Sequence, residues 1–233
     1  EPPALVDIPV TLNPVEAVPS LDRLGRALRE LRISVIDRCN FRCTYCMPLG
    51  SMKGKGSFLP LEKLLTDHEI LDLVNAFVGL GVKKLRLTGG EPLIRPGFPA
   101  LIAQLSEIRG LDDIALTTNG VMLTRLAEDL ANAGLSRITV SLDTLDQGVL
   151  DTLSGGKAKL GEVLEGIAAA EAAGFEPIKI NTVVQKGVND HTSLDLLDHF
   201  RGSSHTVRLI AYMDVGDSTH WSAAEVVSKA ESV

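Results

Sequence analysis

Six short runs rich in β-branched residues and leucine alternate along this chain with longer amphipathic segments. We expect strands at residues 31–37, 83–88, 113–118, 137–143, 178–184 and 207–213. We expect helices at residues 67–80, 123–133, 160–173 and 192–201, each followed at once by a glycine. Glycine tolerates the left-handed conformation that closes a helix. This alternation is typical of an α/β fold, in which a parallel sheet is covered by helices.

The expected strands also share a polar face, because alternate residues of a strand point to opposite sides. The polar members are Arg32, Ser34, Arg86, Thr88, Thr117, Asn119, Thr139, Ser141, Asp143, Lys179, Asn181 and Arg208. The other face is apolar, so helices must cover it. A closed eight-stranded barrel fills its interior with branched aliphatic residues. Six strands with a polar inner face therefore predict an incomplete (β/α)6 barrel of the TIM type, with helices outside and a large polar ligand inside. The alternative is an open sheet whose polar face meets solvent, although doubly wound sheets rarely expose a face.

Length and charge narrow the function classes. A chain of 233 residues favours one domain, and five of its eleven prolines in residues 1–20 predict an extended leader before a fold at 21–221. The net charge of -7 argues against a general nucleic-acid binder. The sequence holds no apolar run of the roughly 18 residues that a membrane span needs. An odd cysteine count and a start without a secretory pattern favour the reducing cytoplasm.

All three cysteines lie within eight residues, at Cys39, Cys43 and Cys46, directly after the first expected strand. This C-x3-C-x2-C spacing suits three thiolates that bind three irons of a [4Fe–4S] cluster and leave the fourth iron open. A structural zinc ion would need a fourth ligand, and no histidine lies near in sequence. A redox pair of Cys43 and Cys46 would leave Cys39 unexplained. Both alternatives stay open, and we expect the cluster.

Two motifs carry a resemblance to a known superfamily. The segment DRCNFRCTYCMP resembles the cluster loop of radical S-adenosylmethionine (SAM) enzymes, in which the open iron binds the amino and carboxylate groups of SAM. The segment LTGGEPL at residues 87–93 is similar to the GGEP motif of that superfamily, whose backbone meets the SAM amino group. Gly89 and Gly90 carry no side chain, and we expect that they allow a ligand to approach the backbone closely.

Further segments resemble the strand ends of one family, the MoaA family of GTP 3′,8-cyclases, from about residue 21 to residue 221. They are KKLRLTGGEPLIRP, DIALTTNG, RITVSLDTLD, IKINTVVQKGVND and VRLIAYMDVG. The resemblance implies that Cys39, Cys43 and Cys46 are the iron ligands. It implies SAM contacts at Tyr45, Gly90, Ser141 and Met213. It implies GTP contacts at Arg32, Arg86, Thr117 and Lys179. Arginine and lysine are the groups that a triphosphate requires.

The reaction that the resemblance implies is a lyase reaction without a catalytic side chain. The reduced cluster cleaves SAM to methionine and a 5′-deoxyadenosyl radical, which removes hydrogen from C3′ of GTP. The C3′ radical attacks C8 and forms (8S)-3′,8-cyclo-7,8-dihydroguanosine 5′-triphosphate, the first step of molybdopterin (molybdenum cofactor) biosynthesis. The cofactor carries the difficult step, and the protein supplies orientation and exclusion of water.

The resemblance also implies partners. They are GTP, an electron donor such as flavodoxin or ferredoxin, and a downstream enzyme that forms the pyranopterin, with no nucleic acid and no membrane. A homodimer is left open. Two other functions also stay open, because a fold does not determine function. One is another radical SAM enzyme, for example one that modifies peptides, and the other is a non-catalytic iron–sulfur protein.

A second [4Fe–4S] cluster is the remaining implication of the resemblance. Three more cysteines would bind it in a C-terminal segment beside an arginine-rich stretch that contacts GTP. This sequence has no further cysteine for it. The sequence ends at residue 233, and residues 222–232 show a pattern typical of a helix. We therefore expect a truncated chain, and a relative that naturally lacks the second cluster is the alternative. Alone, residues 1–233 would bind SAM and phosphates, hold guanine poorly and lack full cyclase turnover.

Overall fold

The computed structural model describes residues 20–47, 58–214 and 221–228. Six parallel strands form one sheet in the order of the sequence. They are β1 (Glu30–Ser34), β2 (Lys84–Thr88), β3 (Asp113–Thr118), β4 (Arg137–Ser141), β5 (Lys179–Val184) and β6 (Thr206–Ala211). Within the described residues no pairing joins β1 to β6, so the predicted incomplete barrel is confirmed.

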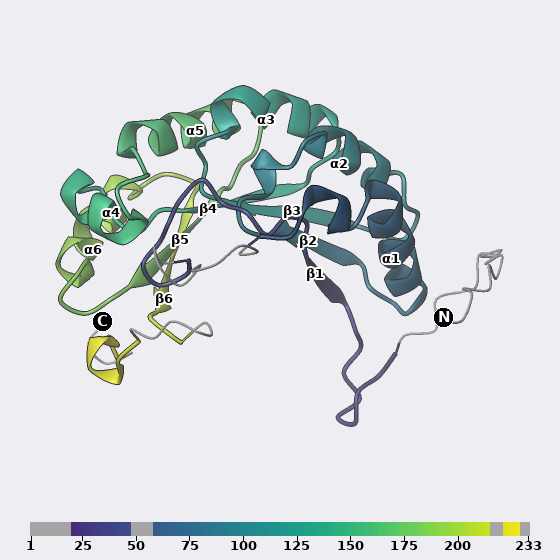
Figure 1. Cartoon of the computed structure of the whole chain (residues 1–233), viewed down its shortest axis with the longest axis horizontal. Helices are drawn as coiled ribbons and strands as arrows, with labels where there is room; N and C mark the ends of the chain where they lie inside the picture. The colour runs from purple at the N-terminus through teal and green to yellow at the C-terminus, as the bar shows by residue number, and fades with distance from the viewer. Residues whose placement is uncertain (1–19, 48–57, 215–220, 229–233) are drawn as a thin grey trace.

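Within the described ranges, six α-helices arch over one side of this sheet (Figure 1). They are α1 (Asp67–Gly79), α2 (Phe98–Ser106), α3 (Leu123–Asn132), α4 (Gln147–Ser154), α5 (Leu160–Ala172) and α6 (Ser193–His199). Single 3-10 turns lie at η1 (Leu61–Lys63), η2 (Pro92–Ile94), η3 (Asp190–Thr192) and η4 (Ala223–Glu225). A capping box of Thr66 and Glu69 begins α1, because each side chain bonds the backbone N–H of the other residue. The glycines at the predicted helix ends have positive φ, for example Gly134 at 92°.

Apolar side chains on the outer face of the sheet form the core with these helices. Leu85, Leu87, Leu116, Ile138 and Ile180 are each at most 1 % exposed. Burying one such side chain contributes about 1.5–3 kcal/mol. A slip of one residue in any strand would exchange this face for the polar one, so the core fixes the register.

The register confirms the polar inner face. Arg32 pairs with Arg86 across β1 and β2, and Asn181 pairs with Arg208 across β5 and β6. Paired residues of neighbouring strands point to the same side of a sheet. The predicted cations therefore face the concave side of the barrel, away from the helices.

Three strands end earlier than predicted, at Ser34, Ser141 and Ala211 instead of residues 37, 143 and 213. The backbone leaves the sheet at these points to build the loops at the carboxyl ends of the strands. After β4, for example, the Val183 N–H donates to the Asp143 side chain rather than to a backbone carbonyl.

The predicted helix at residues 222–232 is wrong for its described part. Residues 222–228 hold only the turn η4 and an isolated bridge from Val226 to Gln185, while 229–233 lie outside the described residues. Of the predicted leader, residues 1–19 also lie outside them. None of the helices in the described ranges combines the length and the apolar character that crossing a bilayer requires.

Candidate active site

The cysteine loop, which we define as residues 35–47, lies against the carboxyl end of β2. The Gly90 N–H donates to the Ile36 carbonyl and the Glu91 N–H donates to the Arg38 carbonyl, both at 2.7 Å. A Cβ atom on Gly90 would lie 1.9 Å from the Arg38 carbonyl oxygen, and one on Gly89 would lie 2.4 Å from that of Ile36. The two backbones approach each other closely, and this contact alone excludes a side chain at either position. It adds a packing role to the ligand approach that the sequence predicts for these glycines.

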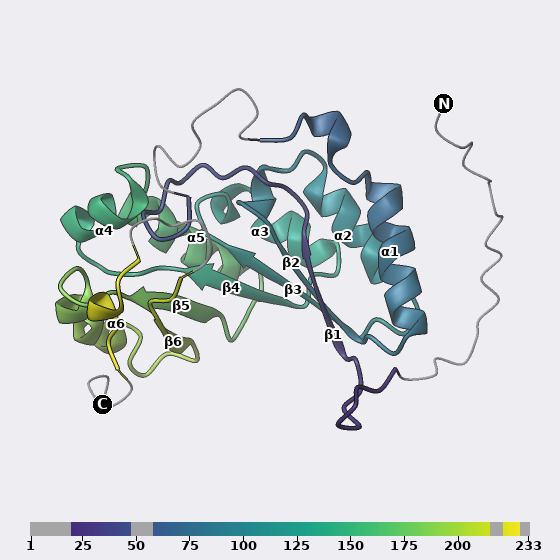
Figure 2. The same ribbon diagram turned by 60° about the horizontal axis from the view of Figure 1, so that its bottom comes forward.

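The same loop docks on the end of α4, as Figure 2 shows for the chain leaving β1. The Arg42 N–H donates to the Ser154 carbonyl at 3.1 Å, and the Thr44 N–H donates to the Leu153 carbonyl at 2.8 Å. Gly155 follows with a φ of 65°, and a Cβ there would lie 2.8 Å from the Arg42 carbonyl oxygen. The loop is thus held between β2 and α4.

Glu91 of the GGEP motif links the ends of β2 and β3. The residue is 1 % exposed, and its carboxylate accepts hydrogen bonds from the Thr118 hydroxyl, the Asn119 N–H and the Leu93 N–H. Burial raises the pKa of this carboxyl, against the smaller effect of its hydrogen bonds. The Asn119 amide then donates to the Asn40 side chain in the cysteine loop at 2.7 Å. Glu91 therefore serves as a structural acceptor beside the cysteines.

Tyr45 links the cysteine loop to β4. Its hydroxyl donates to the Asp143 carboxylate at 2.7 Å. Burial raises the pKa of Asp143 to about 6, although the bonds from Tyr45 and the Val183 N–H oppose the shift. Burial also raises the pKa of Tyr45 well above its ordinary value. The tyrosine that the resemblance assigns to SAM thus has its hydroxyl engaged by the protein.

One cavity brings most of the predicted site residues together. Its lining includes Arg32, Cys39, Cys43, Tyr45, Cys46, Gly90, Thr117 and Ser141. Three predicted residues are not among its lining residues. Met213 follows β6 with 52 % of its surface exposed, while Arg86 and Lys179 belong to the inner face of β2 and β5. The cysteines therefore share a cavity with five of the eight predicted SAM and GTP contacts.

The three cysteines all line one cavity, as thiolates that share one iron–sulfur cluster must. The Phe41 N–H donates to Cys39 Sγ at 3.3 Å, a contact that suits a thiolate. Burial raises the pKa of all three thiols, that of Cys43 to about 12, so metal binding must displace their protons.

Positive charge gathers on the inner face around Lys179. Burial lowers the pKa of this lysine, and repulsion from Arg137, Arg208 and Arg86 lowers it further. Arg137 is ion-paired with Asp113. Arg137 was not among the predicted site residues, although it stands two residues before Thr139 and the same alternation could have found it.

Asn181 is a second residue that the predicted site omitted. Its Oδ1 atom is buried and has no hydrogen-bond partner among the described residues. Asn181 pairs with Ser141 across β5 and β4, so both side chains face the barrel interior. An unpaired buried acceptor costs about 1–3 kcal/mol, which favours a ligand that donates to it. A ribose hydroxyl or an ammonium group of SAM has this chemistry.

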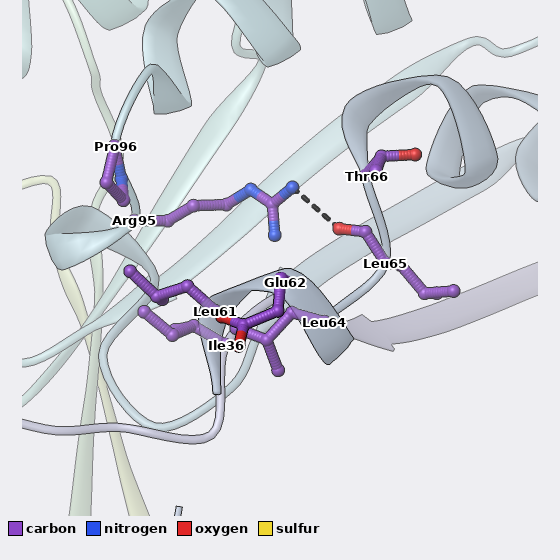
Figure 3. Close-up of a pocket in the computed structure, with 8 residues that line it drawn as sticks. All are labelled: Ile36, Leu61, Glu62, Leu64, Leu65, Thr66, Arg95 and Pro96. Atoms are coloured by element: carbon purple, nitrogen blue, oxygen red, sulfur yellow. Dashed lines mark hydrogen bonds between the residues drawn. The ribbon is translucent and has the colours of Figure 1, made fainter. Parts of the chain in front are cut away.

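Arg95 supports the loop from outside the barrel. Its guanidinium donates to the Val35 carbonyl at 2.6 Å, the Leu65 carbonyl at 2.9 Å and the Asp67 carboxylate at 2.7 Å. A shallow pocket lies beside it (Figure 3), lined by Ile36, Leu61, Glu62, Leu64, Leu65, Thr66, Arg95 and Pro96. This arginine joins the end of β1, just before the cysteines, to the start of α1.

Comparison with known sequences identifies relatives. The model of the Radical SAM superfamily matches residues 33–200. A GTP 3′,8-cyclase of Xanthomonas axonopodis pv. citri is 51 % identical over 213 residues, covering 91 % of this chain and 64 % of the relative. A GTP 3′,8-cyclase of Acidothermus cellulolyticus is 50 % identical over 215 residues, covering 92 % of this chain and 59 % of the relative. This chain thus spans about two thirds or less of the length of these curated relatives.

Solved structures share the fold. SuiB of Streptococcus suis bound to S-adenosylmethionine aligns with a TM-score of 0.65 at 20 % identity, over 82 % of this chain and 42 % of SuiB. Methylornithine synthase (PylB) aligns with a TM-score of 0.62 at 18 % identity, over 81 % of this chain and 54 % of that enzyme. Both alignments agree with the six-stranded partial barrel described above.

Proposed function

Because this chain belongs to the radical SAM superfamily, we propose that it forms the SAM and GTP sites of a GTP 3′,8-cyclase. One observation carries the proposal: three cysteines and a group of cations lie on the same concave side of one sheet. Curated relatives with that name, about half identical over most of this chain, support it. The product would be (8S)-3′,8-cyclo-7,8-dihydroguanosine 5′-triphosphate, on the route to molybdopterin.

Superfamily membership implies a [4Fe–4S] cluster and SAM, and in this proposal Cys39, Cys43 and Cys46 hold the cluster. When bound, a cluster with one open iron supplies the electron that cleaves SAM and yields a 5′-deoxyadenosyl radical. We assign SAM contacts to Tyr45, Gly90, Ser141 and Met213. The first three are supported by their place in the cavity, and Met213 by the resemblance alone.

The GTP contacts in the proposal are Arg32, Arg86, Thr117 and Lys179. Guanidinium and ammonium groups bind phosphate oxygens with charge-assisted hydrogen bonds, and arginine binds them through two parallel bonds. The repulsion around Lys179 in the ligand-free protein supports an anionic occupant, because a phosphate chain would relieve it. Holding the triphosphate on the inner face would orient the ribose toward the cysteines, and orientation lowers the entropic part of a reaction barrier.

Other parts of the proposal concern the whole protein, which this chain matches in part. They are a second [4Fe–4S] cluster near the guanine base, an electron donor such as flavodoxin or ferredoxin, and a downstream pyranopterin-forming enzyme. The three cysteines of residues 1–233 all lie in the cysteine loop, so ligands for a second cluster would come from elsewhere.

The test is formation of 5′-deoxyadenosine by the anaerobically reconstituted chain with SAM and dithionite, with and without GTP. We expect GTP to stimulate its formation, and Lys179→Ala to lose that stimulation while keeping its iron. Cys39→Ala serves as the cluster-free control. Cleavage of SAM that is indifferent to GTP would contradict the cyclase assignment and favour another substrate, such as a peptide. No cleavage by a protein with full iron content would contradict the enzymatic role.

A further inference from the structure

Asp143 is a buried carboxylate to which the proposed function assigns no task. It is 6 % exposed and lies just past the end of β4, in the wall of the cavity. Each of its oxygens accepts one hydrogen bond. The Tyr45 hydroxyl donates to Oδ2 at 2.7 Å, and the Val183 N–H of β5 donates to Oδ1 at 2.8 Å. One side chain therefore joins the cysteine loop to β4 and β5.

The backbone of Asp143 is itself fixed by the strands. The amide of Asn189, a residue with no exposed surface, donates to the Asp143 carbonyl at 2.8 Å and to the Val183 carbonyl at 2.9 Å. The Asn189 Oδ1 atom accepts the Gln185 N–H at 2.8 Å. A residue held on both sides in this way has one available position. It can therefore serve as a rigid anchor for a loop.

The tyrosine that Asp143 bonds lies between two cysteines of the sequence. Tyr45 separates Cys43 from Cys46, and its hydroxyl lies near enough to the Cys43 thiol to lower the pKa of that thiol, against the larger effect of burial. The Cys46 and Met47 N–H groups both donate to the Cys43 carbonyl, a bond pattern confined to the loop. In the described part of the chain, Tyr45 is the residue nearest to Cys46 in sequence that bonds a distant element, and the Thr44 N–H bond to Leu153 lies one residue further away.

We propose that Asp143 is a positioning residue that acts through Tyr45 to hold Cys43 and Cys46 over the carboxyl end of β4, ready for a cluster. The inference rests on the proposed function for the identity of the cluster. Hydrogen bonds behind metal ligands fix the orientation of those ligands, and their loss commonly costs tenfold or more in metal affinity. Loss of the Tyr45 hydroxyl should accordingly loosen the cysteines while leaving the sheet unchanged.

Conservative variants separate this role from a general effect on folding. Tyr45→Phe keeps the ring and removes the donor. Asp143→Asn keeps both contacts, because its oxygen can accept the Val183 N–H while its NH₂ donates to the tyrosine oxygen. Tyr212→Phe is the matched control, since Tyr212 is the other tyrosine of the chain, is buried and follows β6.

The experiment measures iron release to a chelator from reconstituted protein, without SAM or GTP, together with the urea midpoint of each variant. We expect release to be about tenfold faster in Tyr45→Phe, and within about twofold of the unmodified protein in Asp143→Asn and Tyr212→Phe. The reduced cluster of Tyr45→Phe should also give a broadened paramagnetic resonance signal. Equal release rates in Tyr45→Phe and Tyr212→Phe would overturn the inference, as would a change that merely follows the urea midpoint.

A second measurement keeps the inference testable if the proposed function fails. In metal-free protein, iodoacetamide should label Cys43 and Cys46 several-fold faster in Tyr45→Phe than in Tyr212→Phe. Unchanged labelling would overturn the positioning role even if the cluster binds. Faster labelling in a chain that shows no response to GTP would support the positioning role while the cyclase assignment is lost.

Discussion

Replacing Gly90 by alanine tests how the site is built. The added Cβ would lie 1.9 Å from the Arg38 carbonyl oxygen, 2.2 Å from its carbon and 2.9 Å from the Cys39 nitrogen, all of them backbone atoms. Relief to about 3 Å requires the loop and the end of β2 to separate by more than about 1 Å. The Gly90 and Glu91 hydrogen bonds to the loop, both 2.7 Å, would then break. Two such bonds contribute about 1–3 kcal/mol together.

We therefore expect Gly90→Ala to lower the free energy of unfolding of the metal-free protein by about 2–4 kcal/mol, because strain adds to the lost bonds. Urea unfolding measures this, and iron content after anaerobic reconstitution should fall with it. Gly161→Ala is the control, since a Cβ at Gly161 meets no atom within 4 Å and its helical backbone suits alanine. A Gly90→Ala protein as stable as Gly161→Ala, with full iron content, would refute the packing role of Gly90.

Three further outcomes are expected. Since burial raises the folded-state pKa of Asp143 from 3.8 to about 6, its proton stabilises the fold below pH 3.8, and this contribution is lost as pH rises through about 6. Over that pH range the free energy of unfolding of the metal-free protein, measured with urea at each pH, should fall by about 3 kcal/mol relative to that of Asp143→Asn. The same pH dependence in both proteins would contradict this expectation. Arg95→Met should lower the free energy of unfolding, measured with urea, by roughly 2–4 kcal/mol, because two carbonyls and the Asp67 carboxylate lose their hydrogen-bond donor. The control Arg125→Met changes an exposed residue and should lower it by less than about 0.5 kcal/mol. Lys179→Ala should weaken GTP binding about tenfold or more in calorimetry, with a smaller salt dependence, and Lys179→Arg should restore most of it; equal affinities would argue against a phosphate contact.

The strands and their faces could be predicted, because alternate side chains of a strand point to opposite faces of the sheet. When one face is buried, apolar residues therefore recur at every second position. Strand β3 occupies the predicted residues, and the polar members of all six runs face the interior. Helices α2 and α4 were not predicted. Helix α2 is mainly apolar and therefore lacks a clear polar face, and α4 has eight residues with Gly148 inside it. Both owe their stability to tertiary packing, which local patterns do not report.

The candidate site was predictable where a motif or the strand alternation marks it. Cys39 and its two partners share a cavity with Ser141 and Thr117, as expected from their places at strand ends. The bond from Tyr45 to Asp143 spans 98 positions of sequence, and no spacing rule connects such a pair. The packing role of Gly90 was also beyond reach, because a clash between two backbones appears only when both segments are placed.

The docking of the cysteine loop on α4 has a consequence for the order of events during synthesis. Cys46 leaves the ribosome more than 100 residues before Ser154, whose carbonyl holds the loop at Arg42. At a synthesis rate of about 5–20 residues per second, α4 becomes available to hold the cysteine loop on the order of 5–20 s after the thiols have been made. Metal delivered during that interval would meet an unformed loop, so productive loading belongs after α4 has emerged and folded.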